Sequence, residues 1–276
     1  MTLKDIQLIF NRAFFFSFCK KKLLLAFSVL ALCGIMAVFF RGLSINASQW
    51  VRMSLTFLPI FIAAGVLLSM GIFLIRIYHN EIKKKEVLYK EIFNKSWEII
   101  IGASYFSVPL ILVYLLLWMV MGIFVLLNEI PGLGDFFGVI LSFAPFLLNL
   151  GSLVLCLLSL CLLFFVTPLL ALKGLDRAQL SQILIKRVKR DVFSNLLLAL
   201  VAILPLVFLV GFLVLAAVLT GTLCYRCDTP TYTVLQWFFM MIPFTAILAP
   251  AVIFFFNFAT EAHVLLQKEA RGESVA

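Results

Sequence analysis

The sequence predicts an all-α membrane protein, a polytopic helical bundle of six spans that forms one transmembrane domain over residues 1–276. Hydrophobic residues make up 64% of the chain and charged residues only 13%, whereas a soluble domain has about 45–50% and about 25%. The apolar stretches reach 18 or more residues without the alternation typical of barrel strands. Inside a bilayer the backbone must satisfy its own hydrogen bonds, so these stretches should be helices.

Six apolar stretches are each long enough to cross a membrane, because a helical span takes about 20 residues. They cover residues 23–40, 55–77, 99–127, 136–172, 192–220 and 234–258. The fourth would reach roughly 55 Å as one helix, against a hydrocarbon core of about 30 Å. We therefore expect it to tilt, to break or to extend into the cytosol, with Pro145 and Pro168 as the break points.

The basic residues predict the orientation of the spans. Nineteen of the 22 lysines and arginines lie before the first span, in the loops after the second and fourth spans, or in the C-terminal tail. The other side has only Arg41, Arg52 and Arg226. Since basic residues stay on the cytoplasmic side, both termini should be cytoplasmic, and a bacterial inner membrane is the expected location.

The same asymmetry of charge indicates which classes of partner to expect. A net charge of +9 in a soluble protein would suggest nucleic acid, but here the positive-inside rule accounts for it. We expect the lipid bilayer itself and anionic lipid headgroups on the cytoplasmic face as partners, and no nucleic acid. A protein partner or a homo-oligomer stays open.

The even-numbered spans share a motif that indicates an internal repeat. Leu-Thr-Phe-Leu-Pro-Ile at 55–60 is followed by Leu-Ser-Phe-Ala-Pro-Phe at 141–146 and, more faintly, by Phe-Met-Met-Ile-Pro-Phe at 239–244. Its proline falls at Pro59, Pro145 and Pro243, which are the predicted helix-break positions. We interpret the chain as three hairpin units, residues 1–80, 81–172 and 173–276.

Each unit is predicted to begin with an amphipathic helix in the headgroup plane, because one side of the segment before each odd-numbered span is apolar. In the second and third units the opposite side is basic. The apolar residues are Leu3, Ile6, Phe10 and Phe14 in the first unit, Tyr89, Ile92, Phe93 and Trp97 in the second, and Ile183, Leu184, Val188 and Val192 in the third.

Cys224 and Cys227 form a Cys-x-x-Cys pair in the last outer loop. A disulfide, a pair of free thiols and a redox pair all remain open, since disulfides persist in that compartment. A metal site is disfavoured, because closed zinc sites need four ligands and no further Cys or His is placed on this face. Cys19, Cys33, Cys156 and Cys161 are interpreted as packing residues.

No catalytic residue, cofactor or metal is expected, and the chain is predicted not to be an enzyme. All 13 acidic residues fall in loops or at span borders, which disfavours proton-coupled transport and intramembrane proteolysis. The sequence contains no His-Glu-x-x-His, P-loop or Gly-x-Ser-x-Gly motif. The neutral polar residues of the spans, Asn257 among them, are expected to bond neighbouring helices.

One segment resembles a known group of proteins. Residues 167–174 read Thr-Pro-Leu-Leu-Ala-Leu-Lys-Gly and precede a basic amphipathic segment and another span. This pattern resembles uncharacterised six-span bacterial membrane proteins that are similar to the membrane domain of some glycerophosphodiester phosphodiesterases. The resemblance covers mainly residues 140–215 and implies a membrane-embedded accessory role, with no catalytic residue to carry over.

Two functions remain on the sequence alone. The first is a non-enzymatic membrane scaffold or accessory protein that acts through its basic interfacial helices. The second is a transporter or channel for a neutral or amphipathic solute, with the proline-containing spans as gates. The scarcity of charge within the spans favours the first, and a water-filled polar cavity would favour the second.

Overall fold

The computed structural model describes residues 3–84, 89–128, 134–174, 192–221 and 230–271, and within these ranges every regular element is a helix. In chain order the elements are α1 (Leu3–Phe15), η1 (Phe16–Phe18), α2 (Lys20–Ser44), α3 (Gln49–Ile82), α4 (Tyr89–Ser104), η2 (Tyr105–Ser107), α5 (Val108–Asn128), α6 (Gly134–Lys173), α8 (Val192–Leu219) and α9 (Pro230–Arg271).

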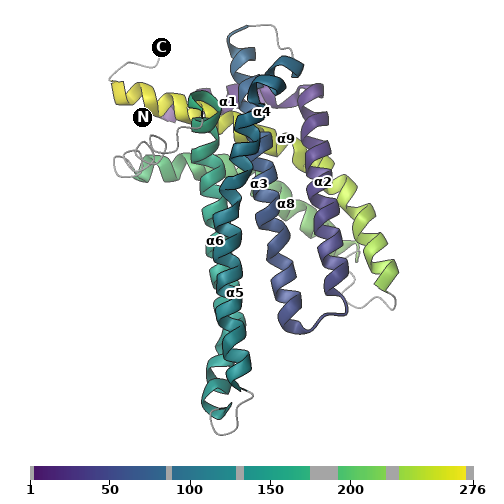
Figure 1. Cartoon of the computed structure of the whole chain (residues 1–276). Coiled ribbons are helices and arrows are strands. Elements are labelled where there is room, and N and C mark those ends of the chain that lie inside the picture. Colours follow the sequence, from purple (N-terminus) through teal and green to yellow (C-terminus); the bar gives the residue numbers. More distant parts are fainter. Residues whose placement is uncertain (1–2, 85–88, 129–133, 175–191, 222–229, 272–276) are drawn as a thin grey trace.

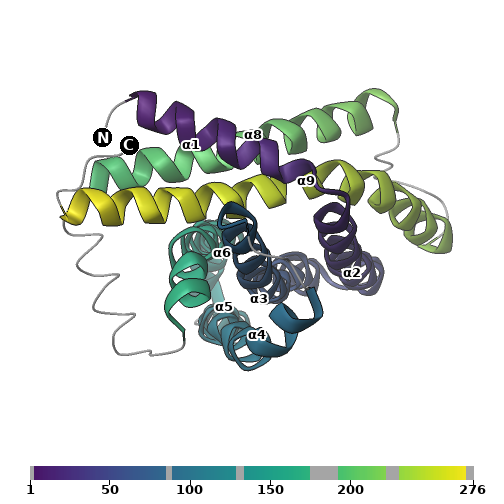
Figure 2. The same cartoon turned by 90° about the horizontal axis from the view of Figure 1, so that it is seen from above.

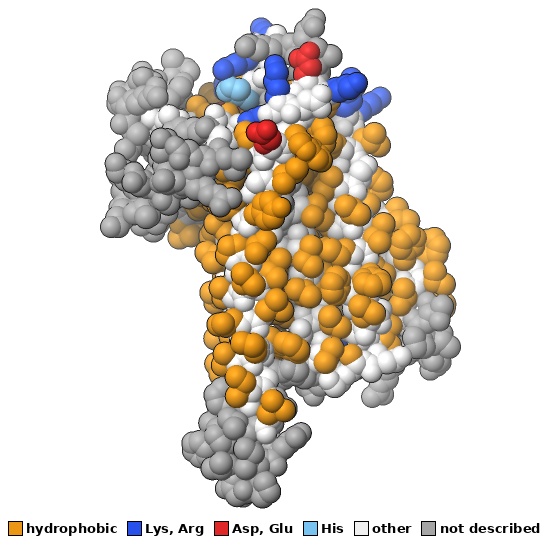
Figure 3. Space-filling view, in the orientation of Figure 1, with side chains coloured by type: hydrophobic (Ala, Val, Ile, Leu, Met, Phe, Trp, Pro, Cys, Tyr) orange, Lys and Arg blue, Asp and Glu red, His pale blue; other side chains and the backbone are white. Residues whose placement is uncertain are grey.

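Six helical segments are long and apolar enough to cross a membrane, which confirms the predicted fold class. They are Lys20–Ser44, Val51–Ile82, Tyr89–Val120, Phe143–Leu172, Phe193–Leu219 and Tyr232–Gln267. Figure 3 shows a flank covered by hydrophobic side chains, with the charged side chains of that face gathered at one end. The chain is therefore a helical multi-pass membrane protein.

The third span contains a change of helix type that the sequence did not predict. The 3-10 helix η2 lies between α4 and α5. Pro109 occupies the first turn of α5, a position that tolerates proline because the N–H there needs no partner within its own helix. The candidate span nevertheless runs from Tyr89 to Val120 through both helices.

The helices form two groups. Figure 2 shows α2, α3, α5 and α6 nearly end-on, while α1, α8 and α9 lie lengthwise across one side of them. The partners of each hairpin, α2 with α3, α5 with α6 and α8 with α9, pack against each other, and α9 also packs against α1, α2, α3 and α6. Helix α3 has the largest buried share of the six spans.

The two ends of the molecule differ in packing. Helix α1 and the C-terminal part of α9 lie at one end, which we call the α1 end, and the α2–α3 connection lies at the other, which we call the turn end (Figure 1). The buried core gathers towards the α1 end, within residues 68–78 of α3, 163–171 of α6 and 249–265 of α9. There Gly71 faces the ring of Phe256 so closely that a Cβ atom would collide with it.

The prolines predicted to break helices lie inside continuous helices. Pro59 is within α3, Pro145 and Pro168 are within α6, and Pro243 is within α9, which also contains Pro250. In a bilayer a broken helix would expose several backbone groups to lipid, whereas an internal proline removes only one hydrogen bond. The length of α6 extends the molecule at the end of the α2–α3 connection, past which the α5–α6 hairpin reaches (Figure 1). The expected extension was at the other end, where the basic segments meet.

The Thr167–Gly174 segment is the end of α6. Gly174 has a φ of 89° and donates its N–H to the carbonyl of Leu170 at 3.1 Å, the left-handed conformation with which many helices end and which favours glycine. The Arg76 Nε of α3 donates to the carbonyl of Ala171 at 3.1 Å. Helix capping and burial thus account for the residue types in this motif.

Candidate functional site

A half-open cavity of about 1100 Å³ lies near the turn end. Its walls come from residues 33–44 of α2, 55–67 of α3, 156–163 of α6 and 237–245 of α9, with Val218 of α8. These helices pack closely towards the α1 end and leave the cavity where they separate. The cavity therefore lies within the membrane-spanning part of the protein.

Small residues create this space. Gly34 and Ala37 of α2 face the cavity, as do Ala63 and Ala64 of α3. Gly34 also lets α2 approach α9, because a Cβ atom there would collide with Met241. The cavity thus results from small side chains on two helices that also contact their neighbours.

The depth of the cavity matches one leaflet of a bilayer. Its wall on α3 runs from Leu55 to Leu67, and twelve helical steps of about 1.5 Å give roughly 18 Å. The hydrocarbon core of a membrane is about 30 Å thick. The cavity consequently extends from the turn end to about the middle of the membrane.

The hydroxyl groups in the walls already donate to their own helices. Ser44 donates to the carbonyl of Arg41 at 2.7 Å, Thr56 to that of Arg52 at 2.8 Å and Ser159 to that of Leu155 at 2.9 Å. Thr245 donates to the carbonyls of Met241 and Ile242, at 3.0 and 2.9 Å. With its hydroxyl hydrogens engaged, the wall presents a mostly apolar surface to an occupant.

Arg41 is the charged residue of the cavity wall. It lies in the last turn of α2, and its guanidinium carbon is 5.6 Å from the centre of the Trp237 ring of α9. A guanidinium over an indole face is held by the ring quadrupole. Within the described ranges the ion pairs involve other residues, Arg12 with Glu261 and Lys22 with Glu81.

The predicted site residues are distributed unevenly around this cavity. Pro59 lines it, and Pro243 lines a smaller cavity of about 400 Å³ between α8 and α9. Pro145 is in the wall of neither. Cys224 and Cys227 lie outside the described residues, as does the third amphipathic segment up to residue 191. Cys33 and Cys156, predicted to be packing residues, line the large cavity.

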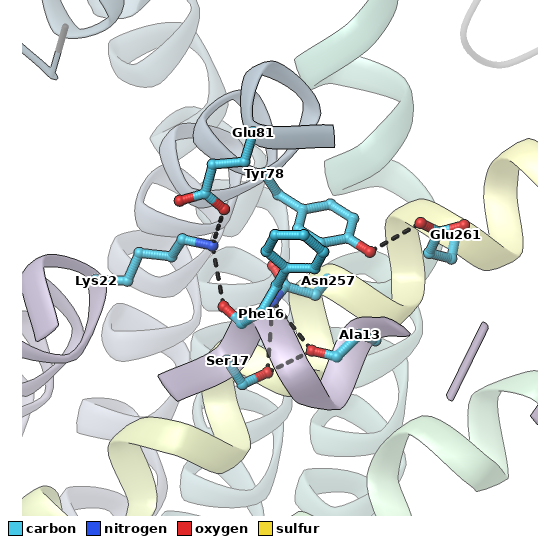
Figure 4. A network of polar contacts seen from close by, with 8 residues as sticks. All are labelled: Ala13, Phe16, Ser17, Lys22, Tyr78, Glu81, Asn257 and Glu261. Atoms are coloured by element: carbon cyan, nitrogen blue, oxygen red, sulfur yellow. Dashed lines mark hydrogen bonds and ion pairs between the residues drawn. The ribbon is translucent and has the colours of Figure 1, made fainter. Parts of the chain in front are cut away.

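A second site, which we call the polar cluster, lies at the α1 end and joins α1, η1, α2, α3 and α9 (Figure 4). Lys22 has no exposed surface. Its ammonium group forms an ion pair with Glu81 of α3 and donates to the carbonyl of Phe16 at 3.0 Å. It also lies 5.6 Å from the centre of the Tyr78 ring. The positive charge is thus enclosed by one carboxylate, one carbonyl and aromatic faces.

Two further contacts tie α9 into the polar cluster. The Tyr78 hydroxyl donates to Glu261 Oε1 at 2.8 Å, and the Arg12 guanidinium lies 3.6 Å from the same oxygen. The Asn257 amide donates to the carbonyl of Ala13 and to the hydroxyl of Ser17, both at 3.4 Å (Figure 4). Asn257 therefore bonds neighbouring helical segments, the role expected of asparagine in a span.

Sequence reasoning missed the polar cluster. Lys22 was counted as a basic residue of the cytoplasmic border and Glu261 as an acidic residue beyond the last span. The signal that could have found it is helical spacing, since Asn257, Glu261 and Leu265 lie four residues apart and share the buried face of α9. That spacing indicates that α9 continues as a packed helix past the predicted end at residue 258.

The first amphipathic helix is packed against protein. Ile9 and Ala13 of α1 are buried, and the Phe10 ring lies 5.0 Å from the ring of Phe254 and 6.5 Å from that of Phe258. Each amphipathic helix also keeps exposed aromatic side chains, Phe14 in α1 and Phe93 and Trp97 in α4, where Ile92 is buried. Helix α1 thus covers part of the α1 end of the bundle.

Comparison with known proteins identifies no family, since no family model, curated protein or solved structure matches this chain. Across the described part of the chain, no group of His, Cys, Asp and Glu side chains is arranged to hold a metal ion. The cavity and the polar cluster are thus the two candidate sites of the described structure.

Proposed function

We propose that this multi-pass membrane protein binds a lipid-like amphipathic molecule in the cavity between α2, α3, α6 and α9. The observation that carries the proposal is an apolar hollow of about 1100 Å³ within the membrane-spanning helices. Sites for drug-sized ligands measure about 300–1,000 Å³ and are mostly apolar. The volume therefore suits a molecule with long hydrocarbon chains.

The lining argues against an ion or a sugar as the occupant. An ion in a membrane needs charged side chains or carbonyl groups to replace its hydration shell, and a sugar needs many hydrogen bonds. The wall hydroxyls already donate to their own helices. The cavity is apolar and so is not the water-filled polar cavity that would favour a transporter for a neutral solute; it supports the binding of an amphipathic molecule.

The accessory role favoured by the sequence is kept as the second candidate. It is supported by exposed lysines near the α1 end, namely Lys20, Lys21, Lys83, Lys84, Lys90 and Lys95. These side chains would attract anionic lipid headgroups, at about 1 kcal/mol each near a charged membrane surface. Both roles are non-enzymatic, and a protein that holds a lipid for a partner would combine them.

The proposal includes the orientation and the location. The α1 end faces the cytoplasm, because the basic residues gather in the segments that meet there. The cavity then opens in the outer leaflet half of the membrane. A bacterial inner membrane is the proposed location, with both termini on the cytoplasmic side.

The proposal is tested by filling the cavity. Ala63 lines it, so Ala63→Phe should exclude a bound lipid, whereas Leu112→Phe places the same aromatic ring on the 59% exposed side of α5, outside the cavity wall. Native mass spectrometry would count the molecules of palmitoyl-oleoyl phosphatidylglycerol that survive release from a detergent micelle. We expect one tightly held lipid on the wild type and Leu112→Phe but not on Ala63→Phe; equal retention by all three would refute the proposal.

A further inference from the structure

We infer that the cavity selects a lipid with an acidic headgroup and that Arg41 binds this headgroup at the turn end. The inference rests on the proposed function and names the class of its ligand. It depends on where Arg41 lies, on how its guanidinium is held and on Arg41 being the charged residue of the cavity wall.

Arg41 lies where a headgroup would be. It belongs to the last turn of α2, next to the connection that ends the α2–α3 hairpin. The cavity continues from there towards Cys33 on α2 and Leu67 on α3, roughly half the thickness of the hydrocarbon core. A lipid with its headgroup at Arg41 would place its acyl chains along these apolar walls.

The contact with Trp237 positions the guanidinium at the cavity mouth. Its central carbon lies over the indole ring, 5.6 Å from the ring centre, and the N–H edge that is directed away from the ring can bind acceptors. Such an edge matches the paired oxygens of a phosphate or a carboxylate. Trp237 and Arg41 come from different helices, so the contact also fixes the two walls of the cavity mouth relative to each other.

Favourable placement at a helix end accounts for only part of this arrangement. A cation in the last turn of α2 interacts favourably with the helix dipole, and that would explain a basic residue at this position. It does not explain why the side chain lines the cavity and lies over an aromatic ring of a second helix. The ion pairs Arg12–Glu261 and Lys22–Glu81 of the described residues do not involve Arg41, and an acidic headgroup would complement its charge.

Arg52 provides a matched control at the same end of the molecule. It is exposed, and its guanidinium donates to the carbonyl of Ala47 at 3.4 Å. It is not part of the cavity wall. Arg52→Gln therefore removes the same charge from the same region without changing the proposed headgroup site.

The test is a competition between two lipids that share their acyl chains, palmitoyl-oleoyl phosphatidylglycerol and palmitoyl-oleoyl phosphatidylcholine. Full-length wild type, Arg41→Gln, Arg41→Lys and Arg52→Gln are each released from neutral micelles containing both lipids in equal amounts, and retained lipid is identified by native mass spectrometry. We expect wild type and Arg52→Gln to retain the acidic lipid about tenfold more. Both headgroups offer a phosphate to the guanidinium, but phosphatidylcholine also brings a cation close to it, which opposes binding.

Arg41→Gln should lose this preference while it still retains phosphatidylcholine, which also shows that the variant is folded. Arg41→Lys should keep part of the preference, because an ammonium has the charge without the planar edge. Millimolar inorganic phosphate should not displace the lipid, since it lacks acyl chains; displacement by phosphate alone would reduce the site to a simple anion site and overturn the inference.

The two proposals fail in different ways. Wild type that retains both lipids equally, or an Arg41→Gln variant that keeps the preference, overturns the acidic headgroup and leaves the lipid cavity intact. Wild type that retains neither lipid, or retention that Ala63→Phe does not reduce, overturns the lipid cavity itself.

Discussion

Lys22 is a charged side chain with no exposed surface at the border of a membrane-spanning helix. A buried ammonium group is costly unless a carboxylate and further acceptors replace its water shell. Here Glu81 provides the charge and Phe16 the carbonyl. Whether the buried Lys22 lowers or preserves the stability of the fold therefore depends mainly on its ion pair with Glu81.

A double-mutant cycle on this pair measures that dependence. Glu81→Leu should lower the free energy of unfolding by about 3–5 kcal/mol, because it leaves the Lys22 charge buried with only a carbonyl. The double variant Lys22→Met with Glu81→Leu should regain most of the loss, since the charge is removed with its partner. The measurement is equilibrium unfolding of the purified protein by sodium dodecyl sulfate, followed by tryptophan fluorescence.

If the double variant were as unstable as Glu81→Leu, the unpaired charge of Lys22 would not be the cause of the loss of stability. Lys83→Met is the matched control, because Lys83 follows the same helix end and is exposed. It should leave stability within about 0.5 kcal/mol of the wild type, as is usual for surface substitutions.

The pairing of Lys22 could not be predicted from the sequence. Counting basic residues assigns each segment to a side of the membrane, and that count depends only on order along the chain. Burial of Lys22 depends on Glu81, which is 59 residues away, and on α9 passing close by. The local sequence around Lys22 specifies neither its distance from Glu81 nor its burial.

At the scale of helices, α3 and α9 meet through Gly71, which lies against the Phe256 ring. Gly71→Ala should lower the free energy of unfolding by about 1–3 kcal/mol, the usual effect of excess volume in a packed core. Gly211→Ala is the control, because a Cβ there meets no atom within 4 Å. It should be neutral or stabilising by up to about 1 kcal/mol, since alanine is the better helix former.

The same unfolding assay compares the two glycine variants. An equal effect of both substitutions would contradict the close approach of α3 and α9. A loss of stability confined to Gly71→Ala would support the close approach, because a Cβ atom meets the Phe256 ring at Gly71 and open space at Gly211.

Helix positions were largely predictable, and helix continuity was not. Apolar length alone located the six spans, because a bilayer requires about 20 apolar residues of each. The prolines at 59, 145 and 243 indicated breaks, yet all three lie within continuous helices. A proline removes one hydrogen bond wherever it stands, but whether the helix then breaks depends on the neighbours that pack around it.

For the whole molecule, the contrast between the α1 end and the turn end predicts a defined orientation. Single cysteines at Lys84 and Asn46, in a variant without the native cysteines, place one thiol at each end, since both residues are exposed. A membrane-impermeant maleimide should label Asn46→Cys in intact bacterial cells and Lys84→Cys only after the membrane is permeabilised. The reverse labelling would mean that the cavity opens in the cytoplasmic leaflet.

Neighbour relations between the helices, and with them the cavity, could not be predicted from the sequence. Lipid-facing and core-facing positions of the spans are equally apolar, so hydropathy does not distinguish a helix surface that meets lipid from one that meets protein. The hollow needs Gly34 of α2 and Ala63 of α3 to face the same space. Such an arrangement follows from tertiary packing, which composition does not specify.

Helix α9 belongs to both sites of the protein. Its residues 237–245 line the cavity, and Asn257 and Glu261 join the polar cluster. Pro250 lies between the two and leaves the carbonyl of Ala246 without its helical partner. Helix α9 therefore lacks one backbone hydrogen bond between its two sites. A displacement of α1 at one end reaches the mouth of the cavity only as far as α9 stays rigid at Pro250.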